Sequence, residues 1–435
     1  MRIVMIGTGY VGLVSGACLS EFGHEVVCVD TDTAKIDGLK RGVIPIYEPG
    51  LDEVVSVNDK SGRLSFETDL KAAMPGAEAV FIAVGTPTRR GDGHADLSYV
   101  FAVAEEIAAH LSGYAVVVTK STVPVGTNRK VEEIIRKAHP DAKFDVASNP
   151  EFLREGSAIE DFRRPDRVIV GCDTDRARAV MREIYRPLYL HETPIVFTSC
   201  ESSELIKYAS NAFLATKITF INEVANLCEK VGANVQDVAR GMGLDGRIGN
   251  KFLHAGPGFG GSCFPKDTLA LLKTAQEYKT PTRIVEAVVA VNEARKREMA
   301  EKIEKALGGV AGKTVAILGL TFKPNTDDMR DAPSLVIVPY LREKGARIRA
   351  FDPEGAKEAK KRLDIEMCAD AYEAMDGADG VAILTEWNEF RALDLGRVKS
   401  LLKRPVMVDL RNIYRPETMT AAGFVYVSVG RPNAG

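Results

Sequence analysis

Gly7-Thr8-Gly9-Tyr10-Val11-Gly12 decides the fold of the first part of this 435-residue chain. The stretch follows an apolar run, residues 2–6, that is typical of a buried strand, and it opens a run compatible with a helix. In the pattern GxGxxG, glycines allow a tight turn and a close approach of backbone to a pyrophosphate. The next predicted strand, residues 25–29, ends before Asp30, which can bind a ribose 2′-hydroxyl. The spacing predicts a dinucleotide site that prefers NAD, and a mere glycine turn is the alternative.

Strands and helices alternate outward from this motif. Further predicted strands cover residues 79–83, 115–119, 144–147, 167–170 and 194–197. Continuous apolar strands separated by helices predict a parallel sheet that is covered on both faces. The loops 85–87, 120–124 and 148–151 follow three of these strands, so we expect them to ring the cofactor cleft. Taken singly, each loop is also compatible with a simple proline turn.

The second half of the chain begins with a helical pattern and then returns to the alternation of strands and helices. Apolar residues recur at helical spacing over residues 202–232, and a second helix is predicted over residues 282–307. After a glycine-rich boundary at 308–313, strands are predicted at 315–318, 347–351, 380–384 and 406–408. The pattern predicts an α/β chain with two Rossmann-like doubly wound lobes joined by a central helical segment. The predicted domains are residues 1–200, 201–308 and 309–435.

Composition narrows the class of protein. The net charge is −3, so no global basic field favours nucleic acid or an anionic membrane surface. No apolar run reaches the roughly 18–20 residues of a membrane span, and the N-terminus lacks the pattern of a signal peptide. The seven cysteines are scattered without a CxxC pair, which argues against a disulfide framework and a structural zinc site. We therefore expect a cytoplasmic protein without a metal.

The glycine-rich stretch 256–267 holds the candidate nucleophile. Pro265 suits a first helical turn, which places Cys263 at or near a helix N-terminus with Lys266 close by. A cysteine in such a position has more thiolate, and a thiolate attacks an aldehyde to give a thiohemiacetal. The alternative is a small buried cysteine beside a flexible loop, which we prefer for the other six cysteines.

Lys207 and Asn211 are four residues apart and therefore share a helix face. Such a pair can hold an oxyanion or a water molecule. The alternative is a solvent-facing lysine with an amide neighbour. In the same way, Glu151 after a predicted strand is either a site residue or a solvated surface acid.

At these residues the chain resembles the UDP-glucose/GDP-mannose dehydrogenase family. The resemblance runs essentially from end to end. It rests on residues 7–12, 120–124, 258–267, Asn149-Pro150-Glu151-Phe152-Leu153, Lys207-Tyr208-Ala209-Ser210-Asn211-Ala212-Phe213 and Phe322-Lys323-Pro324. The sequence of residues 258–267 resembles the branch that acts on UDP-glucose more than the N-acetylmannosamine branch. GDP-mannose remains an alternative substrate.

The resemblance implies roles for matching positions. The catalytic set would be Cys263, Thr122, Glu151, Lys207, Asn211 and Asp267. NAD would contact Gly7, Gly9, Tyr10, Val11, Gly12, Asp30, Lys35, Thr86, Thr122, Glu155, Lys266 and Arg330. The sugar nucleotide would contact Glu151, Phe152, Leu153, Lys207, Asn211, Arg247, Phe252, Leu253, His254, Ala255, Gly256, Gly260, Lys323 and Arg411. His254 stands where many relatives have a lysine, so a strong ionic contact is not expected there.

The resemblance also implies a reaction and an assembly. UDP-glucose would be oxidised to UDP-glucuronate with two NAD and one water, through a thiohemiacetal and a thioester on Cys263, to feed polysaccharide precursor synthesis. The chain would form a homodimer or larger homo-oligomer in which Arg247 reaches the neighbouring site. The rival hypotheses are a single-step alcohol dehydrogenase, which would need no nucleophilic cysteine, and a non-catalytic NAD-binding module.

Overall fold

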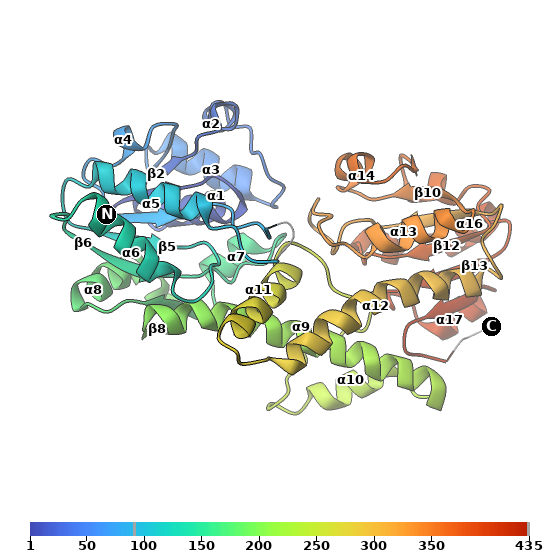
Figure 1. The fold of residues 1–435 in the computed structure, drawn as a ribbon. Coiled ribbons are helices and arrows are strands. Elements are labelled where there is room, and N and C mark those ends of the chain that lie inside the picture. Colours follow the sequence, from blue (N-terminus) through green and yellow to red (C-terminus); the bar gives the residue numbers. More distant parts are fainter. Residues whose placement is uncertain (90–92, 433–435) are drawn as a thin grey trace. The chain divides into compact units, whose positions relative to one another are not determined.

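The computed structural model describes residues 1–89 and 93–432, and it divides into two compact units (Figure 1). The first unit contains residues 1–210 with 269–280, and the second contains residues 211–268 with 281–435. Two helices, α9 (Cys200–Val231) and α11 (Phe264–Glu277), have residues in both units.

The first unit is built on an eight-stranded sheet in the order β3-β2-β1-β4-β5-β6-β7-β8. Its first six strands have the order of a dinucleotide-binding doubly wound fold. All pairs are parallel except the single antiparallel pair between β6 and β7. The strands are β1 (Arg2–Ile6), β2 (Glu25–Val29), β3 (Leu64–Glu67), β4 (Ala79–Ile82), β5 (Ala115–Thr119), β6 (Phe144–Ser148), β7 (Val168–Gly171) and β8 (Ile195–Thr198).

Helices cover both faces of this sheet. Alternate side chains of β1 accordingly point into two different hydrophobic cores. Ile3 and Met5 pack in the core that includes α1 and α3, whereas Val4 and Ile6 pack in the core that includes α5 and α6. The helices are α1 (Tyr10–Glu21), α2 (Thr33–Lys40), α3 (Leu51–Lys60), α4 (Leu70–Ala73), α5 (Ser98–His110), α6 (Thr127–Ala138), α7 (Ala158–Arg163), α8 (Asp175–Ile184) and the 3-10 helix η1 (Arg186–His191).

The second unit contains a six-stranded, wholly parallel sheet in the order β11-β10-β9-β12-β13-β14. Its strands are β9 (Thr314–Leu318), β10 (Arg347–Phe351), β11 (Glu366–Met367), β12 (Gly380–Ile383), β13 (Val406–Asp409) and β14 (Val425–Ser428). Its helices after β9 are α13 (Ser334–Glu343), α14 (Ala356–Arg362), α15 (Ala371–Met375), η2 (Asn388–Ala392), α16 (Leu395–Leu401) and α17 (Pro416–Ala421).

Long helices separate the two sheets in the sequence. After α9 come α10 (Val235–Gly243), α11 and α12 (Arg283–Ala306), and no strand lies between β8 and β9 in the described structure. The predicted fold class is confirmed: two Rossmann-like lobes and a central helical segment. Within the described ranges 1–89 and 93–432, no helix is long and apolar enough to cross a membrane.

Candidate active site

The turn between β1 and α1 has the geometry of a dinucleotide-binding loop. Gly7 has a φ of +102°, and a β-carbon there would lie 2.6 Å from the carbonyl oxygen of Ala83. A β-carbon on Gly12 would lie 1.8 Å from the carbonyl oxygen of Gly7, so this turn requires both glycines. Around Gly9, in contrast, no atom of the described residues lies within 4 Å of a β-carbon position, apart from Gly9 itself and its two chain neighbours. Gly9 therefore leaves space in front of the N-terminus of α1, where a pyrophosphate binds.

Asp30 lies beside this turn, after β2, and it is fixed by several donors. It accepts hydrogen bonds from the backbone N of Thr8 at 2.8 Å, the Thr8 hydroxyl at 2.7 Å and Lys35 Nζ at 3.1 Å. Burial raises the pKa of Asp30, but the hydrogen bonds from Thr8, Asp32 and Lys35 together bring that pKa below its usual value. The carboxylate is thus ionised at neutral pH.

A buried acid that the sequence pattern did not reveal supports the first turn of α1. Glu48 accepts a hydrogen bond from the hydroxyl of Tyr10 and others from the backbone N atoms of Gly156 at 2.6 Å and Ala158 at 2.7 Å. Burial, followed by the effect of Glu48, raises the pKa of Tyr10 far above its ordinary value. Glu48 thereby connects α1 to the loop that carries Glu155.

The loops after β4 and β5 also meet. The hydroxyl of Thr86 donates to the carbonyl oxygen of Thr122 at 2.9 Å. Both threonines follow strands whose carboxyl ends lie at the same edge of the sheet as the glycine turn. The structure therefore brings the predicted loops 85–87 and 120–124 together.

Glu151 and Lys207 form a buried ion pair. Lys207 Nζ lies 3.1 Å from Glu151 Oε1, and the two side chains are only 3% and 6% exposed. The second oxygen of Glu151 accepts the backbone N–H of Leu153 at 2.5 Å, and Lys207 Nζ lies 5.2 Å from the ring centre of Phe152. Burial excludes both alternatives weighed for these residues, the solvent-facing lysine and the solvated acid.

A second buried lysine lies close to this pair and was not among the predicted site residues. Lys120 donates to Asn149 Oδ1 at 3.1 Å and to the Tyr185 hydroxyl at 3.3 Å. Burial lowers the pKa of Lys120 to about 8, while the charge of Glu151 raises it and that of Lys207 lowers it. The available signal was the position of Lys120 directly after an apolar strand, where a lysine is costly to bury.

In the second unit, Cys263 directly precedes α11 and is partly exposed, whereas the other six cysteines are buried. One turn into the helix, Asp267 accepts a hydrogen bond from Asn211 Nδ2 at 2.6 Å and pairs with Lys266 Nζ at 2.6 Å. The backbone N of Asp267 donates to the carbonyl oxygen of Cys263 at 2.8 Å. The predicted cysteine thus stands at a helix N-terminus, with the predicted amide and acid paired nearby.

The loop before Cys263 lies against the second sheet. A β-carbon on Gly256 would approach Arg411 Nη1 to 3.4 Å, and one on Gly260 would lie 2.4 Å from the carbonyl oxygen of Asp331. Arg411 Nε donates to the carbonyl oxygen of Leu384 at 2.7 Å. Of the remaining predicted loop residues, Leu253 and Ala255 are buried, His254 is exposed and Phe252 has a φ of +65°.

Two predicted arginines pair with neighbouring acids, and a predicted lysine lies beside a ring. Arg330 Nη2 lies 2.8 Å from Asp328, and Lys323 Nζ lies 5.3 Å from the ring centre of Phe322. Arg247 pairs with Asp245 at 2.5 Å, and its side chain is 90% exposed.

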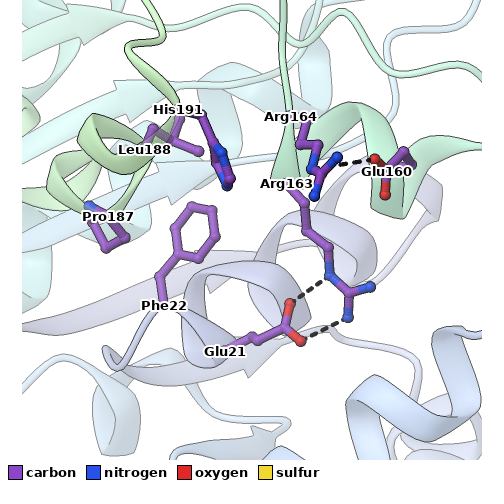
Figure 2. A pocket seen from close by; sticks show the side chains of 8 residues that line it. All are labelled: Glu21, Phe22, Glu160, Arg163, Arg164, Pro187, Leu188 and His191. Carbon is purple, nitrogen blue, oxygen red and sulfur yellow. Dashed lines mark hydrogen bonds and ion pairs between the residues drawn. The ribbon is translucent and has the colours of Figure 1, made fainter.

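A separate hollow of about 360 Å³ lies at the other end of α1 (Figure 2). In the view, both guanidinium groups are engaged: Arg163 with Glu21 and Arg164 with Glu160. Glu21 ends α1, whereas the glycine turn begins it, so this hollow is distinct from the dinucleotide turn. None of the predicted site residues lines it.

The glycine turn, the ionised Asp30 and the doubly wound sheet define a dinucleotide-binding protein with a second Rossmann-like lobe. Three models of one family match successive parts of the chain: the NAD binding domain over residues 1–189, the central domain over 201–294 and the UDP binding domain over 316–416. The chain therefore belongs to the UDP-glucose/GDP-mannose dehydrogenase family, as the resemblance predicted, and its cofactor is NAD.

Similar proteins cover the whole chain. It is 64% identical to a UDP-glucose 6-dehydrogenase of Rhizobium meliloti, and the match covers 100% of both chains. It is 51% identical to the UDP-glucose 6-dehydrogenase TuaD of Bacillus subtilis, over 99% of this chain and 93% of that one. Among solved structures, a UDP-glucose dehydrogenase from Pyrobaculum islandicum matches with a TM-score of 0.91 and 39% identity, over 99% of this chain and 97% of that chain.

Proposed function

We propose that this protein oxidises UDP-glucose to UDP-glucuronate with two NAD and one water. The observation that carries the proposal is Cys263 at the N-terminus of α11, one helical turn from the Asn211–Asp267 hydrogen bond. A single alcohol oxidation needs no such thiol. Full-length similarity to proteins named UDP-glucose 6-dehydrogenase supports the choice of sugar nucleotide.

The chemistry that NAD would supply when bound at the glycine turn is the acceptance of one hydride in each of two oxidations. In the first, the C6 hydroxyl loses its proton to a base or an ordered water, and the C6 carbon loses a hydride, which leaves an aldehyde. The sulfur of Cys263 then forms a bond to the aldehyde carbon, which gives a thiohemiacetal. Loss of the second hydride from that carbon leaves a thioester, and water cleaves the C–S bond to release the carboxylate and restore the thiol. Covalent capture keeps the reactive aldehyde from escaping.

The charged and amide groups have complementary parts in this scheme. Lys207 and Asn211 stabilise the developing oxyanion, because they donate from the same face of α9. Glu151 assists the hydrolysis as a general base. The buried pairing of Glu151 with Lys207 supports these roles, since it holds both groups in one place.

The remaining predicted contacts and the domain boundaries belong to the same proposal. Residues 1–200 bind NAD, 201–308 form the dimerisation segment and 309–435 bind the UDP-sugar. Gly7, Gly9, Tyr10, Val11, Gly12, Asp30, Lys35, Thr86, Thr122, Glu155, Lys266 and Arg330 contact NAD. Phe152, Leu153, Arg247, Phe252, Leu253, His254, Ala255, Gly256, Gly260, Lys323 and Arg411 contact the sugar nucleotide. We place the protein in the cytoplasm, where its product feeds polysaccharide precursor synthesis.

The assembly we propose is a homodimer or larger homo-oligomer. Five large apolar side chains of α9 are exposed, by 44% to 65%: Leu205, Phe213, Phe220, Leu227 and Val231. Phe213, Phe220 and Leu227 are spaced seven residues apart. Such a stripe favours burial against another subunit. The exposed Arg247 supports a contact with the neighbouring site. Light scattering should give a dimer or larger assembly, and Phe220→Glu should shift it toward the monomer.

A panel of substrates tests the reaction. Purified protein with NAD should form NADH with UDP-glucose much faster than with GDP-mannose or UDP-N-acetylmannosamine. Alkylation of Cys263 by iodoacetamide should abolish this activity, and UDP-glucose should protect the thiol. Preference for another sugar nucleotide would overturn the substrate, and full activity after alkylation would favour a single-step alcohol dehydrogenase. If no NADH formed with any of the three substrates, a non-catalytic NAD-binding module would be favoured.

A further inference from the structure

Three buried polar side chains hold the backbone of the loop that leads to Cys263. Asn222 of α9 accepts the backbone N–H of Gly256 at 2.8 Å. Arg295 of α12 donates from Nε to the carbonyl oxygen of the same glycine at 3.0 Å. Asn292, also on α12, accepts the N–H of Phe259 at 2.8 Å and donates to its carbonyl oxygen at 3.1 Å.

These contacts pair backbone N–H and C=O groups of the loop, as the hydrogen bonds of a strand or a helix would. Both polar backbone groups of Gly256 and both of Phe259 are paired, although the loop has no regular structure. The three side chains are only 2–3% exposed. Burial of an arginine and two amides is costly unless they are hydrogen-bonded, and their loop partners supply part of that compensation.

The loop has little free space on either side. Gly258 has a φ of +104°, and a β-carbon there would lie 2.9 Å from Asn292 Oδ1. A β-carbon on Gly261 would lie 2.8 Å from the ring of Phe322, and the N–H of Gly261 donates to the carbonyl oxygen of Arg330 at 2.7 Å. The loop is thus held between α9 and α12 on one side and the segment around residues 322–332 on the other.

We propose that Asn222, Asn292 and Arg295 are positioning residues, which set the backbone of residues 256–259 before the substrate binds and thereby fix the place of Cys263. None of the three belongs to the predicted catalytic or binding set. Cys263 lies two residues beyond Gly261, so a change in the loop is transmitted directly to the sulfur. The consequence for turnover rests on the proposed function, whereas the consequence for the reactivity of the thiol does not.

The test compares two truncations with one control. Asn292→Ala and Asn222→Ala remove loop partners. Asn226→Ala removes a hydrogen-bond acceptor of Arg295 and a donor to Glu298, and it removes no direct contact with the loop. Misplacement of a reacting group by about 1 Å costs on the order of 100-fold, so kcat with UDP-glucose should fall about 10- to 100-fold in the first two variants. The KM for NAD should stay within about twofold, because the NAD turn is untouched. Asn226→Ala should resemble the unmodified protein.

Two further measurements separate positioning from general stability. Asn222 uses only its oxygen in the contact with Gly256, so Asn222→Asp should restore most of the activity that Asn222→Ala loses. The rate of Cys263 alkylation by iodoacetamide, followed by peptide mass spectrometry, should change severalfold in both alanine variants. Folded alanine variants with an unchanged alkylation rate and kcat would overturn the proposal. If the protein did not oxidise UDP-glucose at all, the alkylation rates alone would still decide it.

Discussion

Lys207 Nζ lies 3.1 Å from Glu151 Oε1, and both side chains are buried. The pair joins α9 to the loop that follows β6, two elements more than 50 residues apart in the sequence. Since each charge compensates the other in an environment with little water, the loss of one partner should cost more than the loss of both.

Lys207→Met is therefore expected to destabilise the protein by about 3–5 kcal/mol, because it removes the cation that pairs directly with the buried carboxylate of Glu151. Urea unfolding should show that the double variant Lys207→Met/Glu151→Leu loses less stability than Lys207→Met alone. Lys130 and Glu133 provide a matched control, since they pair at 2.9 Å on the exposed surface. Lys130→Met should change the free energy of unfolding by at most about 1 kcal/mol. Equal losses at the two lysines would contradict this account of the buried pair.

Two glycines of the dinucleotide turn should respond differently to the same substitution. Gly9→Ala meets no atom of the described residues within 4 Å, so the variant should fold normally and lose NAD affinity through a clash with the pyrophosphate. Gly12→Ala places its β-carbon 1.8 Å from the Gly7 carbonyl oxygen and should lower the melting temperature of the apoprotein. Calorimetry with and without NAD distinguishes the two effects. A Gly9→Ala variant with normal NAD affinity would contradict the assignment of the turn.

Asp30→Asn should weaken NAD binding about 10-fold or more, because a charged acceptor of the ribose hydroxyl becomes a neutral amide. Binding of NADP should fall less or improve, since the like charge that opposes a 2′-phosphate is removed while Lys35 stays beside it. Fluorescence titration with both dinucleotides gives the ratio of the two affinities. An unchanged ratio would mean that Asp30 does not select the cofactor.

Lys120 gives a pH-dependent prediction. Burial lowers the pKa of Lys120 from its ordinary 10.5 to about 8, so between these values the unfolded chain binds more protons than the folded one. The free energy of unfolding should therefore rise with pH in this window. Between pH 7 and pH 10, the unmodified protein should gain about 2–3 kcal/mol relative to Lys120→Met. Parallel pH profiles of the two proteins would show that Lys120 titrates normally.

The sequence predicted well the features that depend on local pattern. The glycine turn, Asp30 after β2 and the place of Cys263 before α11 follow from short-range spacing, and the structure has them where they were expected. The apolar strands 2–6 and 115–119 were found because interior parallel strands are apolar on both faces. The edge strands β3, β11 and β14 were missed. In β3 (Leu64–Glu67) the residues alternate between buried and more exposed, and β11 (Glu366–Met367) is only two residues long.

The features that escaped prediction depend on contacts between distant segments. Glu48 meets Gly156 and Ala158 more than 100 residues later, and Asn292 meets Phe259 across 33 residues. Glutamates and asparagines at such positions look like ordinary surface residues in the sequence. Only the fold makes them buried, and burial is what turns their hydrogen bonds into structural requirements.

The stoichiometry of the reaction tests the central claim most directly. Limiting UDP-glucose is mixed with excess NAD, and the NADH formed is counted per sugar nucleotide consumed, for the unmodified protein and for Cys263→Ser. The account predicts a ratio of two for the unmodified protein, and failure of the serine variant to complete the oxidation, because the thioester cannot form. A ratio of one, or UDP-glucuronate released by Cys263→Ser at the unmodified rate, would contradict the covalent double oxidation.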